Sequence, residues 1–212
     1  MRIGVISDTH VPVRARALPG QVFRIFAGVD LILHAGDLVT LDVLDELQAI
    51  APVLAVHGNV DHPEVQERLP AVLRIEVGPS GVIKVESKGP AGGGPLARAG
   101  VRAEAESEAG YEAQAQAQAQ AQAEPSPAVA IGLVHGHEGN GRTTAERAAS
   151  NFPDASVVVF GHSHQPMNEW HDGRLLFNPG SATDPRRAAS ASVGIIEVTE
   201  TVTALVVDLR DE

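Results

Sequence analysis

The chain has 212 residues, of which 43% are hydrophobic and 3% aromatic, so we expect one globular domain with a mainly aliphatic core. It contains no cysteine, which excludes disulfides, thiolate metal sites and a cysteine nucleophile. The formal net charge of −11 argues against sequence-independent binding to nucleic acid or to an anionic membrane.

The first third of the chain predicts alternating strands and helices. Apolar runs at residues 3–6, 31–33 and 53–56 are typical of strands that are buried on both faces of a sheet. A helix is expected between the second and third runs, with Thr40 as its N-cap and Leu44, Leu47 and Ile50 on its apolar face. Pro63 suits the first turn of a further short helix.

The remainder of the chain predicts a second set of strands. Extended segments are expected at 72–77 and 82–86, followed by an apolar run at 131–134, a helix at 143–150 and another apolar run at 157–160. Short stretches at 169–171, 175–177, 193–198 and 202–207 are typical of antiparallel strands. The whole pattern indicates an α/β domain of residues 1–212 with more than one sheet.

Residues 87–127 do not fit this pattern. The segment is rich in Gly, Ala, Pro, Glu and Gln and includes Ala-Gln repeats from Ala113 to Ala123. It lacks the bulky apolar side chains that offset the entropy of ordering. We therefore expect an insertion, disordered or weakly helical, that joins two strands which would otherwise form a hairpin.

Five of the apolar runs lead within a few residues to side chains that bind metals. Because the carboxyl ends of strands in an open α/β sheet form its ligand site, these side chains are expected to converge. Asp, Asn and His suit divalent Mn, Fe, Co, Ni or Zn. The residues are Asp8, His10, Asp37, Asn59, His135, His162 and His164.

Seven such ligands predict two metal ions rather than one, with Asp37 as the natural bridge. Two divalent ions carry about +4 against the charges of Asp8, Asp37 and a bridging hydroxide, which leaves about +1 to attract a phosphate oxygen. Paired metals of this kind activate water and hold the oxygens of an in-line displacement. The predicted chemistry is hydrolysis at phosphorus.

The same residues resemble a known family. Asp8-Thr9-His10, Gly36-Asp37, Gly58-Asn59, His135-Gly136-His137 and Gly161-His162-Ser163-His164 are similar, in order, to the five blocks of the calcineurin-like metallophosphoesterases. Ser7-Asp8-Thr9-His10, Gly58-Asn59-Val60-Asp61 and Asn178-Pro179-Gly180-Ser181 look most like the small bacterial and archaeal phosphodiesterase branch. The resemblance covers almost the whole chain except residues 87–127.

The resemblance implies a four-layer α/β/β/α sandwich with two mixed sheets and a dimetal site, with Mn²⁺ expected and Ni²⁺, Co²⁺, Fe²⁺ or Zn²⁺ as alternatives. By position, one ion would take Asp8, His10, Asp37 and His164. The other would take Asp37, Asn59, His135 and His162. Asp37, Asn59 and His135 would also be the catalytic residues.

One position departs from the family pattern. Many members have a histidine directly after the Asn, which stabilises charge or protonates the leaving group, whereas this chain has Val60. Valine cannot transfer a proton, so substrates with good leaving groups are favoured. His62 and His137 are alternative donors.

Other residues keep two interpretations at this point. Asp61 either orients a ligand through a hydrogen bond or caps the helix at Pro63. His34 and His57 are more typical of the core or of a layer behind the ligands than of the ligand set. Residues 178–181 form a tight turn that either lines the site or only connects elements.

The leading hypothesis is a cytoplasmic dimetal phosphodiesterase in which a metal-bridging hydroxide attacks a small phosphate-ester substrate. The N-terminal segment lacks the pattern of a secretory signal, and no apolar run suggests a membrane span. A homo-oligomer is left open. The alternatives are a phosphomonoesterase and a non-catalytic binding scaffold, since the retromer scaffold subunit has this fold but lacks part of the ligand set.

Overall fold

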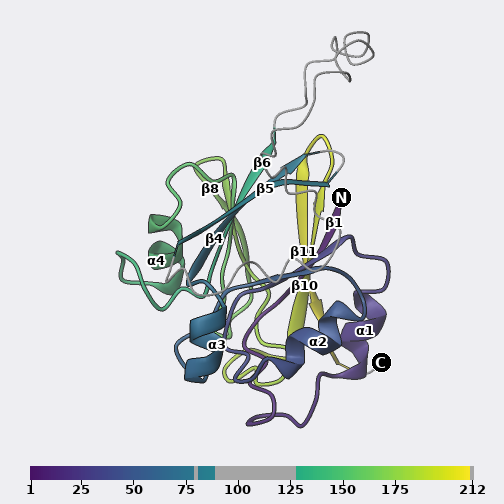
Figure 1. The fold of residues 1–212 in the computed structure, drawn as a ribbon. Coiled ribbons are helices and arrows are strands. Elements are labelled where there is room, and N and C mark those ends of the chain that lie inside the picture. Colours follow the sequence, from purple (N-terminus) through teal and green to yellow (C-terminus); the bar gives the residue numbers. More distant parts are fainter. Residues whose placement is uncertain (79–80, 89–127, 211–212) are drawn as a thin grey trace, which may run out of the picture.

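Two β-sheets face one another, and helices cover their outer faces (Figure 1). The computed structural model describes residues 1–78, 81–88 and 128–210. The predicted four-layer α/β/β/α sandwich with two mixed sheets is confirmed. The predicted insertion, residues 87–127, lies outside the described residues except at its first two positions.

The first sheet contains the three strands that were predicted in the first third of the chain. Strands β1, β2 and β3 are parallel, so their carboxyl ends lie at one edge of the sheet. Strands β10 and β11 complete it by antiparallel pairing beside β1, in the order β11-β10-β1-β2-β3. These strands are β1 (Arg2–Ile6), β2 (Leu31–His34), β3 (Val53–Ala55), β10 (Ser192–Val198) and β11 (Val202–Asp208).

The second sheet has six strands in the order β5-β4-β6-β7-β9-β8. Strands β6, β7 and β9 are parallel, and the remaining pairs are antiparallel. The strands are β4 (Val72–Gly78), β5 (Gly81–Lys88), β6 (Val129–Val134), β7 (Val157–Val159), β8 (Met167–His171) and β9 (Arg174–Asn178).

In the part of the chain that the structure describes, the helices are short: α1 (Gly20–Ile25), α2 (Asp42–Gln48), α3 (Pro63–Arg68) and α4 (Thr144–Ser150). Pro63 begins α3 as predicted, and Thr143 caps α4 through a capping box with Glu146. The prediction that Thr40 caps α2 is wrong. Leu41 occupies the N-cap and its carbonyl accepts from Leu44, so the side chain of Thr40 lies outside the first turn.

Three apolar clusters fill the spaces between the four layers. Residues along β1 alternate between clusters: Ile3 and Val5 pack between the two sheets, whereas Ile6 packs beneath the helices of the first sheet. A third, smaller cluster lies between α4 and the outer face of the second sheet. This alternation explains why the first strands are apolar on both faces.

The prediction that the insertion joins two strands of a hairpin is wrong. Strand β4 lies between β5 and β6 and is antiparallel to both, so β5 and β6 are parallel to each other. Val72 on β4 is opposite Lys88 on one side and Val134 on the other. Lys88, the last residue of β5, and Val129, the first of β6, therefore lie at opposite ends of β4.

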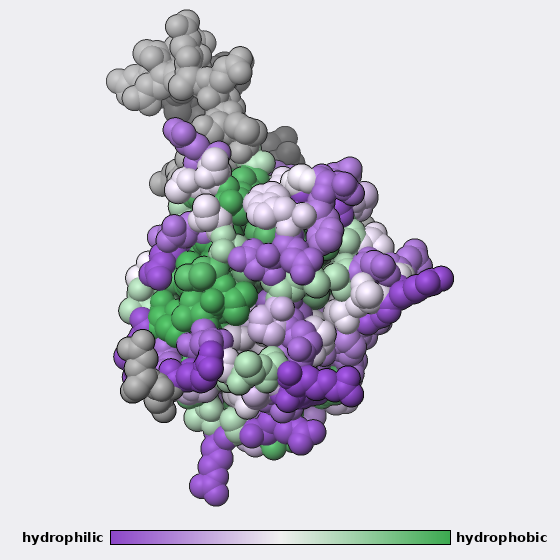
Figure 2. All heavy atoms as spheres, turned by 180° about the vertical axis from the view of Figure 1, so that it is seen from behind, coloured by the Kyte–Doolittle hydropathy of each residue, from purple (hydrophilic) through white to green (hydrophobic). Residues whose placement is uncertain are grey.

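The rear face of the molecule carries one compact apolar area among hydrophilic residues (Figure 2). A groove of about 560 Å³ lies between α1 and β11, with Ile25, Ile195, Leu205 and Val207 in its lining. Leu205 is 61% exposed. None of the helices formed by the described residues is long and apolar enough to cross a membrane.

Candidate metal centre

The loops after the carboxyl ends of β1, β2, β3, β6 and β7 meet between the two sheets. Within the first sheet, the backbone N–H of Asp8 donates to Gly36 O at 3.0 Å, and that of His10 donates to Asp37 O at 3.0 Å. Within the second sheet, Gly161 N–H donates to His135 O at 3.1 Å. These bonds hold the predicted ligand loops in a fixed relation.

Five of the seven predicted ligands form two overlapping groups. One contains Asp8, His10 and His164, the other contains Asp8, Asp37 and His135, and the ligand atoms within each group lie within 4.8 Å of one another. All five side chains are buried. Asp8 belongs to both groups, whereas the predicted division gave it to one metal only.

Short distances connect the two groups. His164 Nε2 lies 3.2 Å from Asp8 Oδ1, and His135 Nε2 lies 3.2 Å from Asp37 Oδ2. His10 Nε2 lies 3.2 Å from His164 Nε2 and 3.8 Å from Asp37 Oδ2. The five side chains therefore make a continuous cluster of two carboxylates and three imidazoles.

Five of the predicted ligands have left-handed backbone conformations, with φ between 46° and 67°. Such conformations are uncommon for residues with a Cβ and cluster where function requires a fixed direction of the side chain. The strand-end loops turn so sharply here that the side chains reach into one space. The residues are Asp8, His10, Asp37, His162 and His164.

Two glycines leave space for the carboxylates. A Cβ on Gly58 would lie 2.0 Å from Asp37 Oδ1, and one on Gly161 would lie 1.8 Å from Ser7 Oγ and 2.7 Å from Asp8 Oδ2. No larger residue fits at either position without displacing these groups. The sequence motif requires glycine here because the backbone approaches the carboxylates closely.

Hydrogen bonds orient two of the imidazoles with Nε2 toward the carboxylates. His135 Nδ1 donates to Ala35 O at 2.8 Å, which joins the second sheet to the first. His164 Nδ1 donates to the backbone carbonyl of Asp184. This pattern, with one ring nitrogen fixed by a carbonyl and the other directed at a charged centre, is typical of metal-binding histidines.

The carboxylates are ionised despite their burial. Burial acts to raise the pKa of Asp37, but His135 and the backbone N–H of Val60, at 3.1 Å from Oδ1, lower it to about 2. For Asp8 the same balance of burial against His164 and His135 holds the pKa below its ordinary value. Ser7 Oγ also donates to Asp8 Oδ2 at 2.6 Å, and the backbone N–H of His162 donates to both carboxylate oxygens.

The environment of His135 fits a cation. Burial acts to lower its pKa, but Asp37 and Asp8 outweigh burial and raise the pKa to about 8. Its Nε2 is buried and makes no hydrogen bond of acceptable geometry, although Asp37 Oδ2 lies 3.2 Å away. A buried nitrogen without a partner, directed at a carboxylate, is what a divalent ion between the two groups would satisfy.

His162 and Asn59 lie at the edge of this cluster. The ring of His162 is half-buried and makes an edge-on contact with that of His135, with 5.1 Å between the centroids. Asn59 is exposed on the loop after β3, and its neighbours Gly58 and Val60 both touch the Asp37 carboxylate. The part of these two residues as ligands stays a prediction.

Asp61 supports the loops rather than the helix. Its buried carboxylate accepts from the backbone N–H groups of Gly58 at 2.6 Å, Val39 at 2.6 Å and Asp37 at 3.2 Å. His62 is the N-cap of α3, which has no side-chain cap bond. Of the two interpretations of Asp61, the structure supports the one in which it orients a predicted ligand.

His34 is fully buried behind the cluster. Gly36 N–H donates to its Nδ1 at 3.2 Å, so the proton is on Nε2, which lies 3.1 Å from Thr9 Oγ1. Burial lowers the pKa of His34 to about 3. His34 is therefore a neutral core residue with both ring nitrogens in use.

The two alternative proton donors differ in position. His137 lies beside the cluster, with its ring centroid 5.4 Å from that of His135 and 6.2 Å from that of His162. His62 is exposed at the start of α3. His57 is half-buried, with its ring centroid 6.5 Å from that of His137.

The turn at residues 178–181 holds the ligand loops from behind. Asn178 Nδ2 donates to Gly161 O at 2.9 Å, and Ser181 Oγ donates to Asp8 O at 2.7 Å. Thr183 Oγ1 extends the contact by donating to Thr9 O at 2.6 Å. Thr183 and Asp184 were missed by the sequence analysis, because they act next to loops that are remote in sequence and Asp184 binds His164 through its backbone carbonyl.

Comparison with known proteins agrees with this arrangement. The family model of the calcineurin-like phosphoesterase superfamily domain matches residues 1–201. The chain belongs to this superfamily. Membership of this superfamily indicates a metal-dependent phosphoesterase. The two overlapping groups of buried Asp and His side chains are the residues that would hold the metal.

Two curated archaeal members of the superfamily are similar to the chain over most of its length. A probable metallophosphoesterase of Methanothermobacter thermautotrophicus is 34% identical over 88% of this chain and 80% of that protein. A second, from Methanocaldococcus jannaschii, is 30% identical over 88% of this chain and 70% of that protein.

Solved structures share the fold. Vacuolar protein sorting 29 from Cryptosporidium parvum has a TM-score of 0.66 at 20% identity and covers 99% of this chain and 92% of its own. An archaeal phosphodiesterase has a TM-score of 0.57 at 19% identity and covers 98% of this chain and all of its own. At these identities the likeness concerns the fold alone.

Proposed function

We propose that the protein is a phosphodiesterase that uses two divalent metal ions, with Mn²⁺ expected, to hydrolyse a small phosphodiester. The observation that carries the proposal is the buried cluster around His135, whose Nε2 faces Asp37 without a hydrogen-bond partner. Two buried carboxylates and several imidazoles are a donor set for divalent transition metals rather than for a single structural cation.

The seven predicted ligands would be shared between two metal ions. Asp8, His10, Asp37 and His164 would hold one ion, and Asp37, Asn59, His135 and His162 the other. When bound, the ions would supply a water-derived nucleophile at neutral pH and neutralise charge on the phosphoryl oxygens. Ala35 and the backbone of Asp184 keep Nε2 of His135 and His164 free for this role, because their carbonyls occupy Nδ1.

Diesters are proposed rather than monoesters because the motifs at residues 7–10, 58–61 and 178–181 look most like the phosphodiesterase branch of the family. Val60 stands where a proton donor is common in the family, so good leaving groups are favoured.

Hydrolysis of bis(p-nitrophenyl) phosphate by the Mn²⁺-loaded protein tests the proposal. We expect turnover that chelator abolishes and Asp37→Asn removes, with a higher kcat/KM than for p-nitrophenyl phosphate. Failure to hydrolyse either compound with Mn, Ni, Co or Fe would contradict a phosphoesterase. Preference for the monoester would replace the diesterase with a phosphomonoesterase.

A non-catalytic binding protein is the second candidate. The groove between α1 and β11 favours it, because the exposed Leu205 and the partly buried Val207 lie there beside Arg2, Arg24 and Glu197, and an apolar area with a charged rim often marks a protein contact (Figure 2). Stoichiometric metal binding without turnover of any ester would support this candidate over the first.

A further inference from the structure

Two arginines from distant parts of the chain pair with Asp184, on the Nδ1 side of the predicted metal ligand His164. Arg14 Nε is 3.7 Å and Arg186 Nε is 3.5 Å from the same oxygen, Asp184 Oδ2. That oxygen is 4.0 Å from Nδ1 of His164, and the backbone carbonyl of Asp184 binds the same ring nitrogen. The side chain of Asp184 thus lies between both guanidinium groups and His164, a predicted metal ligand.

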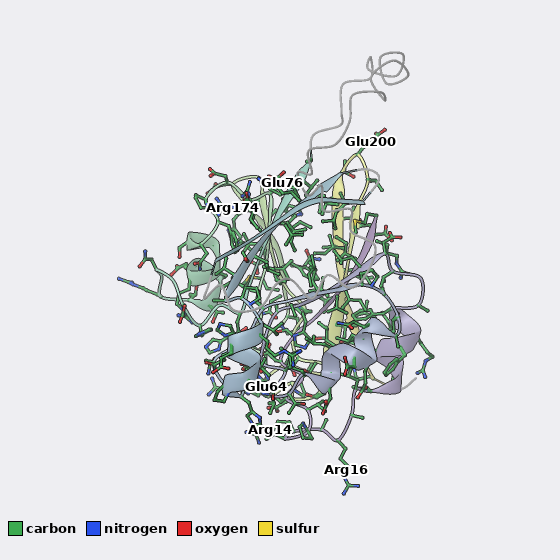
Figure 3. All side chains as sticks on the ribbon, viewed as in Figure 1. Arg14, Arg16, Glu64, Glu76, Arg174 and Glu200 are labelled. Atoms are coloured by element: carbon green, nitrogen blue, oxygen red, sulfur yellow. The ribbon has the colours of Figure 1, made fainter. Side chains whose placement is uncertain are left out.

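The backbone fixes both arginines in this place. Arg14 N–H donates to His10 O at 2.8 Å, so its position depends on the loop that carries the predicted ligands. Arg186 has a left-handed conformation, with φ of 50°, on the loop that Ser181 and Thr183 bind to the backbone of Asp8 and Thr9. Figure 3 shows Arg14 at the same end of the molecule as Glu64 of α3.

The two guanidinium groups share one partner. Each offers five N–H donors, and the ion pairs that they make within residues 1–78, 81–88 and 128–210 both go from Nε to Asp184 Oδ2, at 3.7 and 3.5 Å. Both are also exposed. Arg147 of α4 differs, because its guanidinium group donates to Gly136 O, Arg142 O and Thr144 Oγ1.

The charge of this pair is only partly balanced. Asp184 carries about −1 against about +2 from the two guanidinium groups, whereas a terminal phosphate carries about −1.5 to −2 at pH 7. Guanidinium groups match phosphate oxygens with paired, charge-assisted hydrogen bonds. A local positive site of this kind is also what an acidic protein needs in order to bind a polyanion.

We propose that Arg14 and Arg186 form an anion subsite that binds a second phosphate group of the substrate while the scissile phosphodiester occupies the metal centre. The substrate class is then a phosphodiester that carries an additional terminal phosphate. This inference rests on the proposed phosphodiesterase function and specifies its substrate.

The test uses two compounds that differ only by one terminal phosphate, the 5′-phosphorylated diadenylate pApA and the unphosphorylated ApA. With Mn²⁺-loaded protein we expect kcat/KM for pApA to exceed that for ApA by about tenfold or more, the effect of one or two charge-assisted hydrogen bonds. The double variant R14Q/R186Q should reduce this ratio to about one to threefold. Arg16→Gln is the matched control, because Arg16 is an exposed arginine two residues from Arg14.

A ratio near one in the unmodified protein, or a ratio that the double variant retains, would overturn the subsite. Hydrolysis of neither dinucleotide leaves the phosphodiesterase to the bis(p-nitrophenyl) phosphate test, because a ribose alkoxide is a poor leaving group for a site with Val60 in place of a proton donor. In that case an NMR titration in the presence of EDTA decides the subsite separately. The Nε–Hε signals of Arg14 and Arg186 should then shift with pApA and not with ApA, and unchanged signals would overturn the inference.

Discussion

The carboxylate of Asp61 accepts a hydrogen bond from the backbone N–H of Asp37, the central residue of the predicted dimetal site. The same carboxylate binds the backbone of Val39 and of Gly58, so it joins the loops that follow β2 and β3. Its position makes it a support for two predicted ligands, Asp37 and Asn59, without belonging to the ligand set.

Replacement of Asp61 by Asn should therefore weaken metal binding. One acceptor oxygen becomes an amide donor, which leaves a buried N–H of the loops unpaired and costs about 1–3 kcal/mol of unfolding free energy. Loss of such support typically lowers metal affinity by about 10–100-fold. Mn²⁺ titration and urea unfolding measure both effects. Glu64→Gln, three residues away and exposed, is the control and should change neither.

Asp37 and Asn59 should differ in how many metals they control. Asp37 lies within 3.8 Å of both His10 and His135, so Asp37→Ala should remove both ions. Asn59 is exposed at the edge of the cluster, and Asn59→Ala should spare one ion. Metal analysis of the purified variants gives the stoichiometry directly. Equal losses in the two variants would refute the predicted division of ligands.

Gly161→Ala should destabilise the protein and displace the carboxylate of Asp8. The added methyl would lie 1.8 Å from Ser7 Oγ, which now donates to Asp8, and overpacking of a rigid site typically costs about 1–3 kcal/mol. Gly20→Ala is the matched control, because nothing lies within 4 Å of its added methyl. Urea unfolding should separate the two variants, and equal stability would show that the Ser7 loop moves aside freely.

His34 should make the protein sensitive to acid. Its folded pKa of about 3 lies below the ordinary 6.5, so the unfolded chain binds the extra proton and stability is lost as pH falls below 6.5. The contribution of this residue is about 1.4 kcal/mol per pH unit, or about 2 kcal/mol between pH 6.5 and 5. His34→Gln, which keeps a donor for Thr9, should remove that difference when unfolding is followed in EDTA. An unchanged pH profile would mean that His34 titrates normally.

The sequence predicted the strands and the convergence of their ends, because apolar runs and polar strand ends are local patterns. Asp8, His10, Asp37, His135 and His164 meet for this reason. The role of Asp184 could not be predicted, because it binds His164 through its backbone carbonyl. The position of β4 between β5 and β6 was also missed, since strand order depends on pairing over long distances in the chain.

Strands β5 and β6 run in the same direction, and this sets a lower limit on the length of the segment that joins them. Parallel strands cannot be linked by a tight turn, and a crossover needs about a dozen residues or more. A protein in which residues 89–127 are cut to two or three residues should therefore fail to fold, whereas one that keeps about fifteen should fold and bind metal. Lengthening such a connection costs little free energy, about 0.6 kcal/mol for each doubling of a flexible loop, whereas shortening it below the crossover length would break the strand order.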